Sequence, residues 1–205
     1  MRRRTLNLVL GLGLIAPVAG MLPLPALAEG VDLEKASAPR VLGDPDAKIL
    51  ITEYFSMTCP HCARFHTEVL PQLKEAYIDT GKIRLEMKDF PLDQWALRAS
   101  AMARCLDGKR YFAMIDILMK KQEAWSRAND PYGALVKLGK LAGLSEAQVE
   151  ACMNDEPLID YILNERLTAS RDLGITSTPS FMMNGRKLDG VFTFESFEEA
   201  ISDAL

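Results

Sequence analysis

The feature that most constrains this chain is a Cys-x-x-Cys motif, Cys59-Pro60-His61-Cys62, placed between two kinds of sequence. It follows an apolar, strand-like run over residues 49–55 and precedes a stretch with helical patterning. Two thiols three residues apart on the first turn of a helix can close a small disulfide ring. The unpaired backbone N–H groups and the positive end of the helix dipole favour a thiolate on the first cysteine. The motif therefore predicts a redox-active pair.

The same motif also occurs in structural disulfides, zinc sites and haem attachment sequences. Haem attachment needs a histidine directly after the second cysteine, and position 63 is Ala. A zinc site could recruit His66, but no second Cys or His pair lies nearby in the sequence. The strand before the motif, the helix after it and the histidine inside it favour redox chemistry over a structural disulfide. We therefore expect no cofactor and no metal.

The N-terminus has the pattern of an export signal. Arg2-Arg3-Arg4 is a positive segment, residues 6–20 are apolar, and Ala26-Leu27-Ala28 matches a cleavage site. These features predict a signal peptide over residues 1–28 and export to the periplasm. An uncleaved membrane anchor is the alternative, although the prolines of this segment and the lack of stop-transfer charges argue against a stable span.

The charge of the chain excludes some classes of partner. The 205 residues carry a formal net charge of −4, and the segment 1–28 contributes three arginines and no acids, so the remainder is more acidic still. The sequence shows no cluster of basic residues that would bind nucleic acid and no glycine-rich loop that would bind a phosphate group. The rest of the chain is long enough for one domain with a substantial core, after a short flexible arm over about residues 29–39.

The first half of the fold should be β-α-β. The patterning predicts a strand over about 48–56, a helix over about 60–79 and a strand over 82–88. Pro71 lies inside the predicted helix and should kink it.

About eighty residues of helical pattern follow, and then strand character returns. Asp93, Ser145 and Thr193 are predicted helix N-caps, and Gly174 is a predicted helix end. Asn184-Gly185 indicates a tight hairpin between strands over 180–183 and 187–191. A β-β-α half thus follows the helical segment.

This order of elements resembles a thioredoxin fold, and the segment from Phe55 to Cys62, together with Thr178-Pro179, resembles the DsbA family of exported thiol:disulfide oxidoreductases. The resemblance covers residues 40–205. It implies an α/β fold class, a thioredoxin-like fold interrupted by an all-helical insertion domain. The thioredoxin-like domain would comprise 40–91 and 175–205, and the insertion 92–174.

The resemblance also implies roles for individual residues. Cys59, exposed at the helix N-terminus, would be the nucleophile, and Cys62 would resolve the mixed disulfide. The His61 ring would stabilise the Cys59 thiolate, and Glu53 would be a buried acid that relays the Cys62 proton, with Lys88 as its suggested partner. The candidate catalytic residues are Glu53, Cys59, Pro60, His61, Cys62, Thr178 and Pro179, the last as a cis-proline facing the disulfide.

Cys105 and Cys152 lie in the predicted helical insertion. From the sequence they are either two buried thiols or a disulfide, and an oxidising compartment favours the disulfide. Some members of the resembled family carry a second, non-catalytic disulfide in the helical domain, which supports a structural Cys105–Cys152 bond.

The resemblance implies an oxidase that donates its Cys59–Cys62 disulfide to reduced exported proteins, acts as a monomer and is reoxidised by a DsbB-like membrane partner. Thr178 departs from the pattern, because the best-known strong oxidases of the family have an aliphatic residue before the cis-proline. A selective exchanger, an isomerase or reductase, and a non-enzymatic client-binding protein with a structural disulfide therefore stay as alternatives.

Overall fold

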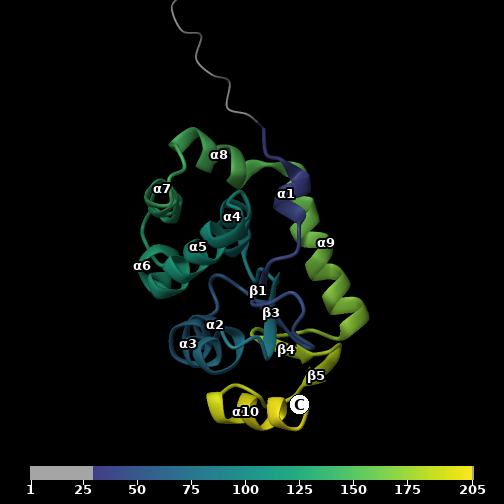
Figure 1. Cartoon of the computed structure of the whole chain (residues 1–205). Coiled ribbons are helices and arrows are strands. Elements are labelled where there is room, and N and C mark those ends of the chain that lie inside the picture. The colour runs from purple at the N-terminus through teal and green to yellow at the C-terminus, as the bar shows by residue number, and fades with distance from the viewer. Residues whose placement is uncertain (1–29, 205) are drawn as a thin grey trace, which may run out of the picture.

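The computed structural model describes residues 30–204, and a five-stranded sheet runs through its centre (Figure 1). The sheet order is β1-β3-β2-β4-β5, in which only β2 and β3 are parallel neighbours. The strands are β1 (Val41–Leu42), β2 (Ile49–Phe55), β3 (Ile83–Asp89), β4 (Ser180–Met183) and β5 (Arg186–Leu188). The predicted signal peptide, residues 1–28, lies outside the described residues.

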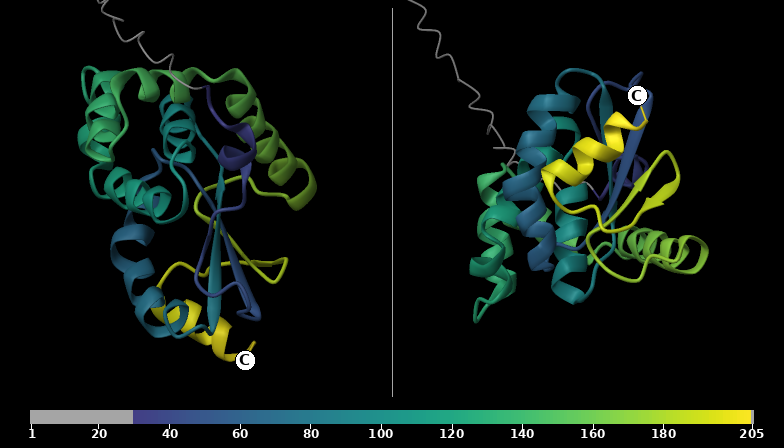
Figure 2. Two further views of the ribbon diagram at one scale, coloured as in Figure 1. Left: turned by 45° about the horizontal axis from the view of Figure 1, so that its top comes forward. Right: turned by 90° about the horizontal axis from the view of Figure 1, so that it is seen from below.

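Helices cover both faces of this sheet. The helix that follows β2 and the C-terminal α10 lie on one face, and α9 lies on the other (Figure 2). Between β3 and β4 the chain forms six helices, most of which make up the upper part of Figure 1. The helices are α1 (Leu33–Ser37), α4 (Gln94–Arg104), α5 (Gly108–Lys120), α6 (Gln122–Ser126), α7 (Pro131–Leu141), α8 (Glu146–Asn154), α9 (Glu156–Leu173) and α10 (Phe194–Ser202), besides the segmented helix after β2.

Strand β2 is buried on both faces because helices cover both. Ile51 and Phe55 point into the main hydrophobic core, which also contains Cys62 and Phe65. Tyr54, on the opposite face, packs in a second cluster that includes Ala169 of α9. Since side chains alternate along a strand, Glu53 shares its face with Ile51 and Phe55. This places a carboxyl group inside the main core.

The helix after the motif is not a single α-helix. It consists of α2 (Pro60–Arg64), the π-helical turn η1 (Phe65–Val69), α3 (Leu70–Leu73) and a second π-helical turn, η2 (Lys74–Ile78). Its buried side chains recur every four residues, at Phe65, Val69, Leu73 and Tyr77. A regular α-helix would rotate such a row by about 40° at each repeat. The wider π turns keep the row facing the sheet, and η1 ends just before Pro71, which cannot donate an N–H.

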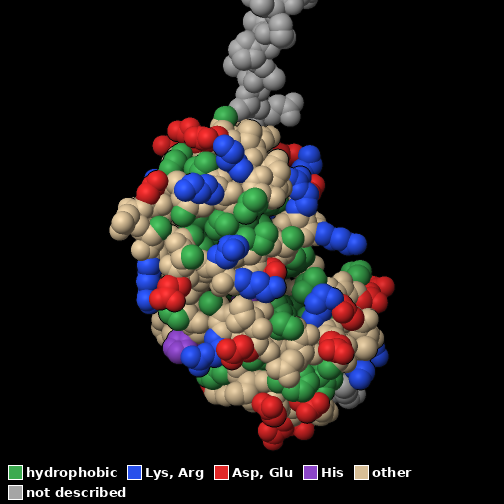
Figure 3. Space-filling model, turned by 90° about the vertical axis from the view of Figure 1, so that its left-hand side faces the viewer, with side chains coloured by type: hydrophobic (Ala, Val, Ile, Leu, Met, Phe, Trp, Pro, Cys, Tyr) green, Lys and Arg blue, Asp and Glu red, His purple; other side chains and the backbone are tan. Residues whose placement is uncertain are grey.

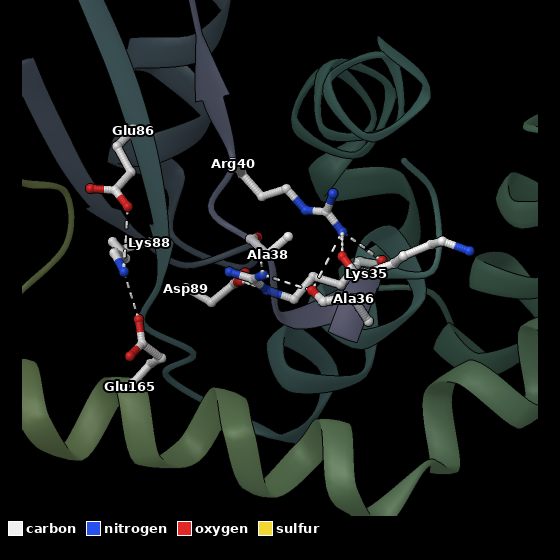
Figure 4. A network of polar contacts seen from close by, with 9 residues as sticks. Lys35, Ala36, Ala38, Arg40, Glu86, Lys88, Asp89 and Glu165 are labelled. Carbon is white, nitrogen blue, oxygen red and sulfur yellow. Dashed lines mark hydrogen bonds and ion pairs between the residues drawn. The ribbon is translucent and has the colours of Figure 1, made fainter. Parts of the chain in front are cut away.

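The segment expected to be a flexible arm contains α1, so that prediction was wrong. Ala36 of α1 is buried. Its carbonyl accepts hydrogen bonds from the guanidinium groups of Arg40 and Arg104 (Figure 4). Arg104 also pairs with Asp89 at the end of β3. The sequence missed this element because five residues are too few to show a helical period, and the arginines that hold it lie outside it.

Local sequence signals predicted several other ends of helices and strands correctly. The Asp93, Ser145 and Thr193 caps are confirmed, since each side chain accepts a backbone N–H of its helix. Asn184 and Gly185 form the hairpin turn with positive φ angles of 49° and 80°. Strand β5 ends at Leu188, three residues earlier than expected, and α6 was not foreseen.

The surface carries both signs of charge. On the face shown in Figure 3, Lys and Arg side chains stand among Asp and Glu side chains and between hydrophobic patches. None of the helices within residues 30–204 is long and apolar enough to cross a membrane.

Candidate active site

The two cysteines of the motif occupy different positions at the start of α2. Cys59 is the N-cap residue with extended backbone angles, and Pro60 takes the first helical position, where a missing N–H has no cost. Cys62 lies one turn further and is fully buried, whereas Cys59 is 4% exposed. Both are free thiols. The sequence led us to expect an exposed Cys59, and that expectation was wrong.

The loop before β4 covers Cys59. The Thr178–Pro179 peptide bond is cis. The Cys59 Sγ–H donates to the Thr178 carbonyl oxygen at 3.1 Å. This contact brings together residues 119 positions apart in the chain. The Thr178 hydroxyl is also buried and has no hydrogen-bond partner within the described part of the chain while Cys59 is a thiol. It becomes a donor to Cys59 when that sulfur is a thiolate.

The surroundings of Cys59 stabilise its thiolate. A hydrogen bond from the Cys62 thiol, and further ones from the Thr178 side chain and the backbone N–H groups of Cys62 and His61, lower the pKa of Cys59 to about 5. Burial acts in the opposite direction and is outweighed. The backbone N–H groups of the helix N-terminus contribute, as the sequence predicted, but the hydrogen bonds from the Cys62 and Thr178 side chains have the larger effect on the pKa of Cys59. The His61 contribution comes from its backbone N–H rather than its ring.

Cys62 is held as a thiol. Burial raises its pKa well above the ordinary value, and its hydrogen bond to Cys59 and the nearby Glu53 carboxyl act in the same direction. One sulfur of the pair therefore favours the anion and the other retains its proton.

Glu53 is fully buried, and its partner is His66 rather than Lys88. The His66 Nε2 lies 2.9 Å and 3.2 Å from the two carboxylate oxygens. Lys88 instead pairs with Glu86 and Glu165, as Figure 4 shows. Lys88 lies directly opposite Tyr54 in the parallel pair of strands, so these two side chains share one face of the sheet. Glu53 is the neighbour of Tyr54 along β2, and its side chain therefore points to the other face, away from Lys88.

Two residues that sequence reasoning did not place at the site lie beside it. His66 was weighed only as a zinc ligand, although its i, i+4 spacing from Cys62 could have placed it on the same helix face. Gln122 was not singled out. Its side-chain amide donates to the carbonyl oxygens of Met57 and Cys59, each at 2.9 Å, and so ties α6 to the motif. No local signal could have found that contact.

A partly apolar cavity of about 410 Å³ adjoins the motif. His61, Arg64, Phe65, Ser177, Thr178, Pro179, Phe181, Phe192 and Thr193 line it. The structure thus brings the motif and the cis-proline loop to one surface hollow.

The second cysteine pair lies away from this hollow. Cys105, just after α4, is joined to Cys152 of α8 by a disulfide, with a Cα–Cα distance of 6.2 Å. The bond therefore closes the helices between them into one loop of the chain.

Comparisons with known proteins agree with this geometry. The model of the thioredoxin family matches residues 35–203. The putative protein-disulfide oxidoreductase of Rickettsia bellii is 34% identical over 166 residues, which make up 80% of this chain and 64% of that protein. The chain therefore spans less than two thirds of this curated relative.

Solved structures are similar over more of their length. The crystal structure of α-DsbA1 from Wolbachia pipientis has a TM-score of 0.75 and 32% identity, covering 89% of this chain and 92% of that one. The protein-disulfide isomerase from Novosphingobium aromaticivorans has a TM-score of 0.72 and 25% identity, covering 81% and 96%.

Proposed function

Since the chain belongs to the thioredoxin family, as a DsbA-like member, we propose that it is a thiol:disulfide oxidoreductase. In this proposal it donates its Cys59–Cys62 disulfide to reduced exported proteins. The observation that carries the proposal is the opposite protonation preference of two sulfurs in one helical turn, Cys59 with its pKa lowered to about 5 and Cys62 with its pKa raised. A structural disulfide needs no such difference.

The chemistry follows from that difference. A client thiolate attacks Cys59 Sγ of the oxidised protein, and the electron pair of the Cys59–Cys62 bond passes to Cys62 Sγ, which takes up a proton. A second client thiolate then attacks the client sulfur of the mixed disulfide. Cys59 leaves as a thiolate, and its low pKa makes it a good leaving group.

The lowered pKa also favours transfer of the disulfide to the client. At pH 7 a thiol whose pKa falls from about 9 to about 5 stabilises the reduced protein by about 2–3 kcal/mol. For a two-electron couple this raises the reduction potential by about 40–60 mV. The pair should therefore be more oxidising than an unperturbed dithiol.

The surroundings of the motif support roles for the other candidate residues. Pro60 sets the helix start, Pro179 and Thr178 cover Cys59, and the hollow beside them would receive the client segment. His61 would contribute its ring toward the Cys59 thiolate that forms when the client leaves. Glu53 would exchange a proton with Cys62.

We also propose the domain division of the sequence analysis, with a thioredoxin-like domain over 40–91 and 175–205 and a helical insertion over 92–174. The occurrence of α4 to α9 together between β3 and β4 supports it. The proposed setting is the periplasm, reached through a signal peptide, where a monomer would be reoxidised by a DsbB-like membrane partner.

The test is the redox equilibrium of the Cys59–Cys62 pair with glutathione, together with oxidation of a reduced two-cysteine peptide. We expect a potential well above that of thioredoxin, about −270 mV, and catalytic peptide oxidation that Cys59→Ser abolishes. Absence of turnover, with unfolded-protein binding retained in Cys59→Ser, would favour a client-binding protein.

An isomerase or selective exchanger is the second candidate, and Thr178 is the observation that favours it. A hydroxyl beside the redox sulfur adds a hydrogen-bond donor that an aliphatic residue lacks. Reactivation of a scrambled multi-disulfide protein separates the two functions. An isomerase restores activity in that assay, whereas an oxidase acts only on reduced substrate.

A further inference from the structure

We propose that His66, with the cavity beside it, forms a proton path that connects the Cys62 thiol to solvent through Glu53. The inference rests on the proposed oxidoreductase function, because only disulfide exchange at Cys62 requires a proton there. His66 is a positioning residue in this path: it acts on Cys62 through Glu53 and does not touch the client.

The side chains of Cys62, Glu53 and His66 lie between strand β2 and the helix that follows it. Cys62 and His66 are four residues apart and face β2, and Glu53 is on the β2 face turned toward them. Cys62 and Glu53 are each 0% exposed, and His66 is 5% exposed. The Glu53 carboxylate contacts His66 Nε2 at 2.9 Å and is near enough to Cys62 to influence its pKa.

The kind of side chain paired with Glu53 bears on whether a proton can be passed along. A buried carboxylate needs a hydrogen-bonded partner, and this chain uses an arginine for that purpose at Asp89, which pairs with Arg104. A guanidinium stays protonated and cannot pass a proton on, whereas an imidazole can hold a proton on either ring nitrogen or on both. Glu53 is therefore paired with a side chain that can pass a proton on, unlike the arginine beside Asp89.

A cavity leads outward from His66. It measures about 250 Å³, and its lining includes Leu70, Met87 and Phe112, with Lys74 and Asp116 among them. The side chains of Lys74 and Asp116 are each about half exposed, which marks the end of the cavity that faces solvent. Its size is enough for several waters. Water there would complete the path from His66.

The titratable groups around His66 come from four elements. Glu53 on β2 faces it directly, Cys62 precedes it on α2, and the cavity brings Lys74 of η2 and Asp116 of α5 to its outer side. Lys74 is paired with Asp79, and Asp116 with Lys120, so each is balanced by its own partner. Glu53 is the charged group in contact with the ring.

The proton and electron balance of the step is as follows. When a client thiolate forms a bond to Cys59 Sγ, the Cys59–Cys62 bond breaks and its electron pair goes to Cys62 Sγ. The His66 imidazolium gives a proton to the Glu53 carboxylate, Glu53 passes that proton to Cys62, and His66 takes up a proton from solvent through water in the cavity. During reoxidation the proton returns by the same path.

The first test is His66→Gln, which keeps an N–H donor near Glu53 but cannot carry a proton through the ring. Single-turnover reduction of the oxidised protein by a thiol peptide is followed from pH 5 to 9. We expect a rate about a hundredfold lower than in the wild type, at the low end of general acid–base effects, and loss of one ionisation from the pH profile. The Cys59 pKa, read from thiolate absorbance, should not change. An unaltered rate and profile would overturn the proposal.

Phe112→Leu is the matched control, because it changes the packing of the same cavity and leaves His66 and Glu53 in place. It should keep the wild-type pH profile. If Phe112→Leu alters the profile as His66→Gln does, His66 has only a packing role and the proposal is wrong.

Chemical rescue gives a second, independent measurement. In His66→Gly the cavity is open to added imidazole, which should restore the rate, whereas pyrazole, similar in shape but a far weaker base, should not. Equal rescue by both, or by neither, contradicts a proton path. Should both variants fail to fold, the wild type decides: a solvent deuterium isotope effect near unity on the same step would overturn the inference.

These outcomes separate the two proposals. A wild-type protein without turnover defeats the oxidoreductase function and this inference with it. A wild-type protein that oxidises peptides, and whose rate and pH profile His66→Gln leaves unchanged, defeats the inference alone.

Discussion

The chain contains two cysteine pairs, and their settings differ in almost every respect. Cys59 and Cys62 lie within one helical turn, at a helix N-terminus and under the cis-proline loop. Cys105 and Cys152 are 47 residues apart and join two helices of the segment between β3 and β4. The first pair is surrounded by hydrogen-bond donors aimed at one sulfur. The second is a link between helices.

The difference shows that the environment of a cysteine pair, rather than the cysteines themselves, determines whether its disulfide is redox-active or structural. A thiolate that is stable in the folded protein makes the reduced state favourable and the disulfide easy to give away. A bond that closes a long loop without such donors mainly restricts the unfolded chain. The predictions below test each side of this contrast.

The largest effect should be on activity. Cys59→Ser removes the sulfur that clients attack, so peptide oxidation should fall at least about a thousandfold, to the level of the uncatalysed reaction. The folded Cys105→Ser, Cys152→Ser double variant should retain turnover in the same assay. Loss of all turnover in that double variant would remove the distinction between the pairs.

The next effect is on stability. Closure of the 47-residue span should stabilise the fold by about 4 kcal/mol in the chain-entropy account. Urea unfolding of the double serine variant should therefore show a lower free energy of unfolding by about that amount. A change below about 1 kcal/mol would mean that the bond does not act as a structural link.

The redox pair should affect stability with the opposite sign. A thiol pKa lower in the folded than in the unfolded state stabilises the folded reduced protein fully above the unfolded pKa, near 9, and this is lost as the pH falls through about 5. We expect the reduced form to be the more stable at pH 7. Its advantage over the oxidised form should shrink by about 2 kcal/mol between pH 7 and pH 5, measured by urea unfolding of both forms. An oxidised form clearly more stable at pH 7 would make this pair a structural bond too.

The smallest predicted effect concerns the contact between the two regions. Gln122→Leu removes the donor that serves the Met57 and Cys59 carbonyl oxygens and leaves both buried acceptors without it. The free energy of unfolding should fall by about 1–3 kcal/mol. Gln122→Glu, with similar size and no N–H donor, is the matched control and should lose at least as much. If neither variant is destabilised, α6 does not support the motif.

Signals carried by a few adjacent residues allowed most of the fold to be predicted. The Cys-x-x-Cys motif after a buried strand, the capping residues Asp93, Ser145 and Thr193, and the Asn184-Gly185 turn each have a local physical cause, and each element formed where that cause predicts. The resemblance to a known family ordered these elements into the correct fold class.

What escaped prediction depends on contacts between distant residues or on very short elements. Glu53 and His66 are thirteen positions apart, and nothing local to either indicates the pairing. The five residues of α6 and the two of β1 are too short for any periodicity. The cover over Cys59 comes from a loop 119 residues later, which is why its exposure was predicted wrongly.

The π-helical turn η1 has a consequence for how this region tolerates changes of length. A π turn holds about one residue more than an α turn in the same stretch of helix, so deletion of one residue between Phe65 and Val69 could be absorbed by conversion to α geometry. The same deletion in a regular α-helix would rotate everything beyond it by about 100°. Loss of a single residue during evolution should therefore be tolerated better at the π turns η1 and η2 than in the α-helical parts of this helix, and alignments of related sequences should have their gaps there.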